Sequence, residues 1–200
     1  MKKIDPSDIK NIIEYEKVRI PFRSKIIGMK NTRRLKVGEL ITFTFENRHT
    51  VVFQIEEMMR VERIVDDAKI MNEIETYNEL IPRDDELSAT LFVEVDEQAK
   101  VKPVLDSLVG LNKDSVFLDV AGKSIPAVFE EGHATDDRIS AVQYVRFKLS
   151  REDAETFNDP TKPARIVIRH KNYNATSDIT SETRKALIGD LAQHSVNVWN

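Results

Sequence analysis

Short segments in which apolar and polar residues alternate recur along this chain, and they constrain its fold more than any other feature. In the first of them Ile41, Phe43 and Phe45 alternate with two threonines, which is the pattern of a half-buried β-strand. Further segments of this kind follow, separated by turn-forming residues. The predicted strands are residues 40–45, 87–95, 116–120, 125–129, 141–147 and 165–170.

Helical segments lie between these strands, but without the regular strand–helix alternation that a parallel sheet requires. Asn47 can cap a long helix over residues 48–78, with a bend near Asp66 and Asp67. Shorter helices are predicted over residues 97–110, from Ser150 or Asp153 to about residue 158, and over residues 181–193. The sequence therefore predicts an α+β fold in which a mostly antiparallel sheet packs against the long helix.

An N-terminal helical arm precedes the sheet. Asp5 and Pro6 favour a helix start, and Pro21 is expected to end that helix and to open a second one. We predict one domain over residues 1–200, with the arm at 1–36, a sheet-containing body at 39–200 and a C-terminal helix.

The charges of the arm and the body have opposite signs. Residues 1–38 hold 11 Lys and Arg against 4 Asp and Glu, whereas residues 39–200 hold 19 against 30, so the net charges are +7 and −11. A basic arm can meet an anionic partner, its own body or a second copy of the chain. The internal or homo-oligomeric interpretation is favoured over nucleic acid, because aromatic residues do not interleave the basic ones.

The chain contains no cysteine, which excludes disulfides, thiolate ligands and cysteine nucleophiles. Asp5, Pro6 and Asp8 interrupt the start that a signal peptide would need, and no apolar run is long enough for a membrane span. The expected location is the cytoplasm, with no membrane partner.

Motifs for catalysis and cofactors are weak. Two Glu-x-x-His pairs, Glu46 with His49 and Glu130 with His133, have the spacing of di-iron ligands, but neither lies within a predicted helix. The sequence Gly122-Lys123-Ser124 ends like a phosphate-binding loop, yet Phe117 occupies the position of its first glycine. We predict no metal, no cofactor and no catalytic residue.

The long helix supplies most of the candidate site. Its apolar side chains, Val52, Ile55, Met58, Met59, Val61 and Val65, share a broad face at 100° per residue. Glu62 falls within that face, so we expect it to be buried and paired with an arginine of a neighbouring element. The candidate partners are Arg23, Arg48, Arg146 and Arg169. Glu56 falls on the outer side. A polar rim for a ligand or for a neighbouring loop would consist of Arg48, Gln54, Glu57 and Arg60.

His170 ends the last predicted strand, and Tyr173 follows three residues later. The two side chains can act as an acid–base pair or can hold a loop in place. The tentative ligand-binding set is Arg48, Gln54, Glu57, Glu62, His170 and Tyr173.

Stretches along the whole chain resemble an uncharacterised bacterial domain-of-unknown-function family of about 200 residues. The most specific stretch is residues 45–50 running into 54–63, and others are residues 4–9, 14–16, 22–23, 33–38, 77–82, 140–147 and 170–173. Members of that family are often encoded beside rubrerythrin-like and iron–sulfur oxidoreductase genes. The resemblance therefore implies a redox or oxidative-stress setting and names no activity.

Two hypotheses follow. The first is a non-catalytic accessory protein that docks onto a redox partner or onto a second copy of itself. The second is a small-ligand-binding domain or an enzyme, with a polar pocket between the long helix and the sheet.

Overall fold

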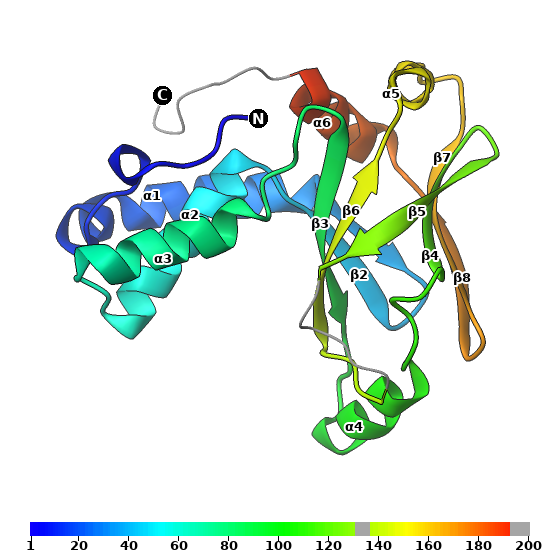
Figure 1. Ribbon diagram of the computed structural model, residues 1–200, viewed down its shortest axis with the longest axis horizontal. Helices are drawn as coiled ribbons and strands as arrows, with labels where there is room; N and C mark the ends of the chain where they lie inside the picture. Colours follow the sequence, from blue (N-terminus) through cyan, green and yellow to red (C-terminus); the bar gives the residue numbers. More distant parts are fainter. Residues whose placement is uncertain (131–136, 193–200) are drawn as a thin grey trace.

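Eight strands form one antiparallel sheet that curls until its first and last strands meet (Figure 1). The computed structural model describes residues 1–130 and 137–192. The strand order is β1-β2-β3-β6-β5-β4-β7-β8, and each neighbouring pair is antiparallel. The strands are β1 (Arg34–Val37), β2 (Ile41–Phe45), β3 (Glu86–Val93), β4 (Val116–Val120), β5 (Lys123–Phe129), β6 (Val142–Lys148), β7 (Ala164–His170) and β8 (Tyr173–Asp178).

The interior of this barrel-like sheet is a continuous apolar core. On β3, Leu87 and Leu91 point inward and are buried with Phe43 of β2 and Phe147 of β6. The alternate residues of β3 are buried as well: Ser88 donates to the carbonyl oxygen of Leu80, and Thr90 donates to the Glu46 carboxylate. The predicted antiparallel α+β fold is confirmed, and its curvature into a nearly closed barrel is an addition that local alternation does not reveal.

The Tyr173 side chain closes the barrel. Its hydroxyl donates to the carbonyl oxygen of Val37 (2.6 Å) and accepts the backbone N–H of Leu40 (3.1 Å), so β8 is joined to the β1–β2 turn. Gly38 lies in this turn with φ +69°, and a Cβ there would collide with the Tyr173 hydroxyl. Only glycine gives the close approach and the positive φ without strain.

We predict that Tyr173→Phe lowers the free energy of unfolding by about 2 kcal/mol, because it leaves a carbonyl and an N–H of the β1–β2 turn without their partner. Urea denaturation followed by circular dichroism measures the change. Thr176→Ala, an exposed change on the same strand, should stay within about 0.5 kcal/mol of the wild type. Equal stability of Tyr173→Phe and the wild type would show that the closure does not depend on the hydroxyl.

Four helical elements form a second unit beside the barrel (Figure 1). They are the 3₁₀ helix η1 (Pro6–Asp8), α1 (Ile12–Asn31), α2 (Arg48–Glu62) and α3 (Asp67–Asn78). Their apolar side chains form a cluster of their own, in which Tyr15 and Phe22 of α1 meet Ile55 and Met59 of α2. Residues 1–10 cross α2 and α3, and Ile4 exchanges two 2.8 Å hydrogen bonds with the Asn78 side chain.

The remaining helices cover the two ends of the barrel. In Figure 1, α4 (Gln98–Ser107) lies at one end, and α5 (Arg151–Asn158) and α6 (Ser181–Ala192) lie at the other. Leu108 and Leu111 after α4, and Leu187 of α6, are buried in the barrel core. Ser150 caps α5 and Thr180 accepts the N–H of Thr183 at the start of α6.

Three local expectations are wrong. Pro21 does not end the first helix, because it lies inside α1 on the exposed side, where water can hydrate the carbonyl that loses its donor. Residues 34–37, for which no strand was predicted, form strand β1. A further strand, β8, follows the β7 strand that was expected to be the last.

The predicted long helix is two helices. Arg63 ends α2 in the left-handed conformation (φ 54°), and Asp66 caps α3 by accepting the N–H of Lys69. The bend expected near Asp66 and Asp67 is therefore a complete break that begins at Arg63.

Candidate functional site

The structure distributes the six predicted site residues over separate contacts. Arg48, Gln54, Glu57 and Glu62 lie on α2, His170 ends β7 and Tyr173 begins β8. Their side chains have different partners. None of the six lines the α5–α6 pocket, which lies at the other end of the barrel from α4.

Arg48 and Glu57 hold neighbouring elements against α2. Arg48 is buried and forms an ion pair with Asp8 of η1. Glu57 accepts a hydrogen bond from Arg19 Nε (2.6 Å) and another from the Tyr15 hydroxyl (2.7 Å). The Arg19 hydrogen bond holds the pKa of Glu57 below its ordinary value, and burial raises the pKa of Tyr15.

Gln54 lies where α2 and α3 meet the sheet. It forms side-chain hydrogen bonds with Tyr77 of α3 and Tyr144 of β6, and burial raises the pKa of both tyrosines. Close by, the Glu46 carboxylate accepts the hydroxyls of Thr50 and Thr90. These contacts join the helical unit to the barrel at the place where a polar pocket was expected.

Glu62 is exposed, so the prediction that it is a buried carboxylate is wrong. The buried carboxylate of α2 is Glu56, which is 1% exposed. Its Oε1 accepts the backbone N–H of Lys10 (2.9 Å), and its Oε2 is buried without a hydrogen-bond partner. Burial raises the pKa of Glu56 to about 7.

The cause of this error is the end of α2. Val61 and Val65 were included in the apolar face, but both are exposed, and Ile64 is buried in their place. Removing the two valines rotates the apolar face toward Glu56. The covering segment, residues 1–10, comes from far away in the sequence, so helical periodicity contains no signal for it.

His170 holds the loop after α4. Its Nε2 lies 3.1 Å from the carbonyl oxygen of Val109, and its Nδ1 accepts the N–H of Asn172 at 3.4 Å. Tyr173 lies opposite His170 in the β7–β8 register, but its hydroxyl points to the β1–β2 turn. The pair therefore serves two different connections.

The two Glu-x-x-His pairs have different outcomes. Glu46 precedes the Asn47 cap and contacts threonines, whereas His49 lies in the first turn of α2. His133 lies outside the described residues. Among residues 1–130 and 137–192, no group of three or more His, Asp or Glu side chains is placed to hold a metal ion.

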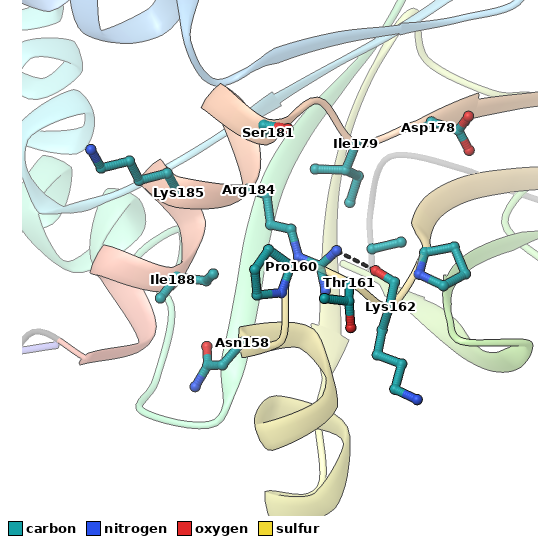
Figure 2. Close-up of a pocket in the computed structure, with 12 residues that line it drawn as sticks. Asn158, Pro160, Thr161, Lys162, Asp178, Ile179, Ser181, Arg184, Lys185 and Ile188 are labelled. Atoms are coloured by element: carbon teal, nitrogen blue, oxygen red, sulfur yellow. Dashed lines mark hydrogen bonds between the residues drawn. The ribbon is translucent and has the colours of Figure 1, made fainter.

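A pocket of about 580 Å³ lies at the end of the barrel that α5 and α6 cover (Figure 2). Its floor consists of the buried residues Ala164, Ile179 and Arg184, together with the half-buried Ile188. Its rim consists of exposed residues from the α5–β7 loop, the end of β8 and the first turns of α6. The rim residues are Asn158, Pro160, Thr161, Lys162, Pro163, Asp178, Ser181 and Lys185.

Arg184 is the central side chain of this pocket (Figure 2). Its guanidinium group donates to the carbonyl oxygens of Phe157 (2.8 Å), Asp159 (2.8 Å) and Thr156 (3.3 Å), and also to that of Lys162. Arg184 therefore caps the C-terminal end of α5, where carbonyl groups have no helical partner. The guanidinium group also lies over the Phe157 ring, 5.1 Å from its centroid.

The positive charge of Arg184 is buried without a salt bridge to any residue that the structure describes. Burial lowers its pKa from the ordinary arginine value. Lys162 and Lys185 extend on opposite sides of it, and Asp178 is the one acidic side chain of the lining. The lining thus has three cationic groups, one anionic group and several apolar surfaces.

This pocket could not be predicted from the local sequence pattern. Arg184 lies in a predicted helix with ordinary surface spacing, and the loop that it caps is a common Asn-Asp-Pro helix stop. The one available signal is the rigid loop with two prolines, Pro160 and Pro163, directly before a buried strand. Nothing local indicates that the arginine of α6 reaches that loop.

No helix in the described part of the chain combines the length and the apolar character that crossing a membrane requires.

Comparisons with known proteins place this fold in a family. The model of the family described as "Protein of unknown function (DUF3501)" matches residues 3–191. A crystal structure of a novel protein of unknown function from Burkholderia pseudomallei K96243 is 28% identical, with a TM-score of 0.88. The match covers 94% of this chain and 99% of that one. No curated protein matches the sequence. The chain belongs to the DUF3501 family.

Proposed function

We propose that the protein is a non-catalytic accessory protein that binds a small anionic molecule in the α5–α6 pocket. The observation that carries this proposal is the buried guanidinium group of Arg184, which forms no salt bridge with a described carboxylate and has only the longer-range attraction of Asp159 beside it. A charge taken out of water favours an opposite charge beside it. An anion above the pocket floor would provide that charge.

The rest of the lining supports an anion that also has an apolar part. Lys162 and Lys185 can approach the anionic group from the rim, and the first turn of α6 adds the positive end of a helix. Pro160, Pro163, Ile179 and Ile188 offer apolar surface of the kind that dominates small-molecule sites. A carboxylate or phosphate monoester attached to a compact apolar group satisfies both requirements.

The pocket chemistry supports binding over catalysis. The lining residues include no histidine, and an arginine side chain keeps its proton at neutral pH. A general base must lie within hydrogen-bond reach of a nucleophile. The Thr161 hydroxyl donates to Asp159 Oδ1 (2.7 Å), but the same oxygen accepts the backbone N–H of Thr161 (2.9 Å), which is the arrangement of a side chain that holds a turn.

A thermal-shift screen tests the proposal. The probes are inorganic phosphate, nucleoside monophosphates and aliphatic and aromatic carboxylates, each tested on the full chain. A specific ligand at one hundred times its dissociation constant should add about 2.7 kcal/mol of stability. The variant with Lys162→Glu and Lys185→Glu should bind such a ligand at least about tenfold more weakly, a loss of about 1.4 kcal/mol.

Lys171→Glu is the matched control. It reverses an exposed lysine at the β7–β8 turn, outside the pocket lining, and should leave the thermal shift unchanged. If no anion in the panel stabilises the wild type, or if the control loses as much affinity as the pocket variant, the pocket assignment is incorrect.

The redox setting is a second part of the proposal. It is supported by the gene neighbours that the family resemblance implies, and the absence of cysteine is compatible with the reducing cytoplasm that we propose as its location. We expect the protein to co-purify with a neighbouring rubrerythrin-like protein. The two purified proteins are mixed and run on a size-exclusion column, with and without the ligand from the screen. If they elute as two separate peaks in both cases, the redox partnership is contradicted, whereas the pocket proposal is not affected.

A further inference from the structure

Three isoleucines form a stripe on the outer side of α1. Ile13, Ile20 and Ile27 are spaced by seven residues and are 74%, 79% and 42% exposed. Successive residues of a helix are 100° apart, so positions seven apart lie almost above one another. The buried residues Tyr15 and Phe22 lie on the opposite side of the helix. The stripe therefore points directly away from the core of its own chain.

Ile13 and Ile20 contribute little to the packing of the isolated chain, and Ile27 is only partly covered by it. Isoleucine is also a poorer helix former than the leucine, lysine or glutamate that usually occupies an exposed helical position. Apolar residues in a heptad repeat are the pattern by which one helix packs along another, and the stripe supplies one of the two apolar positions of each heptad. The exposed face of α1 thus has the form of a helix-packing surface.

We infer that this face binds the same face of a second copy of the chain, with the two α1 helices antiparallel about a two-fold axis at Ile20. In this arrangement Ile20 contacts its own counterpart. Ile13 then lies beside Ile27 of the partner subunit, because the two residues are equally far from the axis. All three isoleucines are covered by one isologous contact.

The charges beside the stripe fit this arrangement. Glu16 and Arg23 lie on the same flank, the one that faces α2, as the 2.6 Å contact between Arg60 Nε and Glu16 shows. An antiparallel two-fold pair brings like flanks together with their directions reversed. Glu16 then lies next to Arg23 of the partner subunit, and the reciprocal pair forms as well.

The other flank carries Lys17 and Ser24, both exposed. The same symmetry places Lys17 beside Ser24 of the partner subunit, so no like charges face each other. A parallel pair would bring unlike flanks together, so that Glu16 would lie beside Lys17 of the partner subunit and Arg23 beside Ser24 of the partner subunit. The face is therefore complementary in charge to a second copy of itself, and the cross-linking and charge-reversal tests below separate the two orientations.

The mass in solution is the first test. Light scattering after size exclusion should give twice the 23.0 kDa of one chain. Ile20→Glu places two carboxylates at the two-fold axis and should give a monomer with an unchanged circular dichroism spectrum, since residue 20 is exposed. Val128→Glu, an equally polar change at an exposed valine of β5, should remain dimeric. A monomeric wild type up to millimolar concentration would overturn the inference, as would a dimer that survives Ile20→Glu.

Single cysteines test the orientation, because the chain has none of its own. Ile20→Cys should form a disulfide-linked dimer under mild copper–phenanthroline oxidation, since its counterpart lies directly across the axis. Ile13→Cys should not, because the two sulfurs would be about 21 Å apart along the helices, far beyond disulfide reach. Efficient cross-linking of the Ile13→Cys variant would show a parallel pair and refute the proposed symmetry.

The flank charges give a third test. Arg23→Glu should weaken the dimer, because it faces Glu16 of the partner subunit, and adding Glu16→Arg to the same chain should restore it. Failure of the second change to restore any dimer would contradict the proposed pairing. These tests need no ligand, so they are independent of the α5–α6 pocket.

Discussion

Replacing Asp190 by alanine is expected to lower the free energy of unfolding by about 3–5 kcal/mol, because it leaves the buried charge of Arg33 without its partner. The two terminal nitrogens of the Arg33 guanidinium group, Nη1 and Nη2, each donate to one carboxylate oxygen of Asp190. The two side chains are only 6% and 4% exposed. Arg33 lies between α1 and β1, and Asp190 lies in the last turn of α6, so the pair fastens α6 to the helical unit. Urea denaturation measures the loss.

Two companion variants identify the cause of that loss. Replacing both partners, with Arg33→Met and Asp190→Leu, should cost much less than Asp190→Ala, since no charge is then left buried alone. Arg34→Ala is the control, because Arg34 is exposed and pairs with Glu94 at the surface. It should cost less than about 1 kcal/mol. An Asp190→Ala protein within 1 kcal/mol of the wild type would show that the pair is dispensable.

Replacing Glu56 by glutamine is expected to make the protein more stable at pH 8 by about 3 kcal/mol and to change little at pH 4. Burial raises the pKa of Glu56 from 4.5 to about 7. Between these values the folded state binds more protons than the unfolded state, so the wild-type stability falls as the pH rises through this range. A shift of about 2.5 pKa units corresponds to about 3 kcal/mol. The glutamine can still accept the N–H of Lys10 through its oxygen.

The difference between wild type and Glu56→Gln, measured by urea denaturation from pH 4 to pH 8, isolates this one group from the other titrating residues. Glu62→Gln is the matched control, because the same substitution at an exposed position of the same helix should give a flat difference. The outcome that would contradict the assignment is a flat difference for Glu56→Gln as well. The sequence pattern alone predicts the opposite ranking, with Glu62 as the sensitive residue.

The strands that local alternation predicts are those with one face in the barrel core. β2, β3, β4 and β6 follow this rule because their inward residues are large and apolar. β8 escapes prediction because its residues, Tyr-Asn-Ala-Thr-Ser-Asp, carry little apolar character. It is a strand because β7 offers it a complete hydrogen-bonding edge, and tertiary context outweighs propensity in such a position.

The candidate site was less predictable than the fold, because it depends on contacts between distant segments. Glu57 and Gln54 were proposed to bind a ligand, and in the structure their side chains have partners within the chain, which come from α1, α3 and β6. Arg184 was not selected at all, since its four acceptors are carbonyl groups and leave no pattern of side-chain types. A sequence shows residue types and spacings, and neither records which backbone carbonyls an arginine will reach.

The Tyr173 closure also sets a limit on when the barrel can form during synthesis. β1 is the first strand to leave the ribosome and β8 is the last, yet these two strands meet in the finished sheet. Until Asp178 has emerged, β7 presents an open hydrogen-bonding edge to other chains, and β1 lacks the strand that will lie beside it. A nascent chain that stalls before this point is therefore the form of this protein most exposed to aggregation.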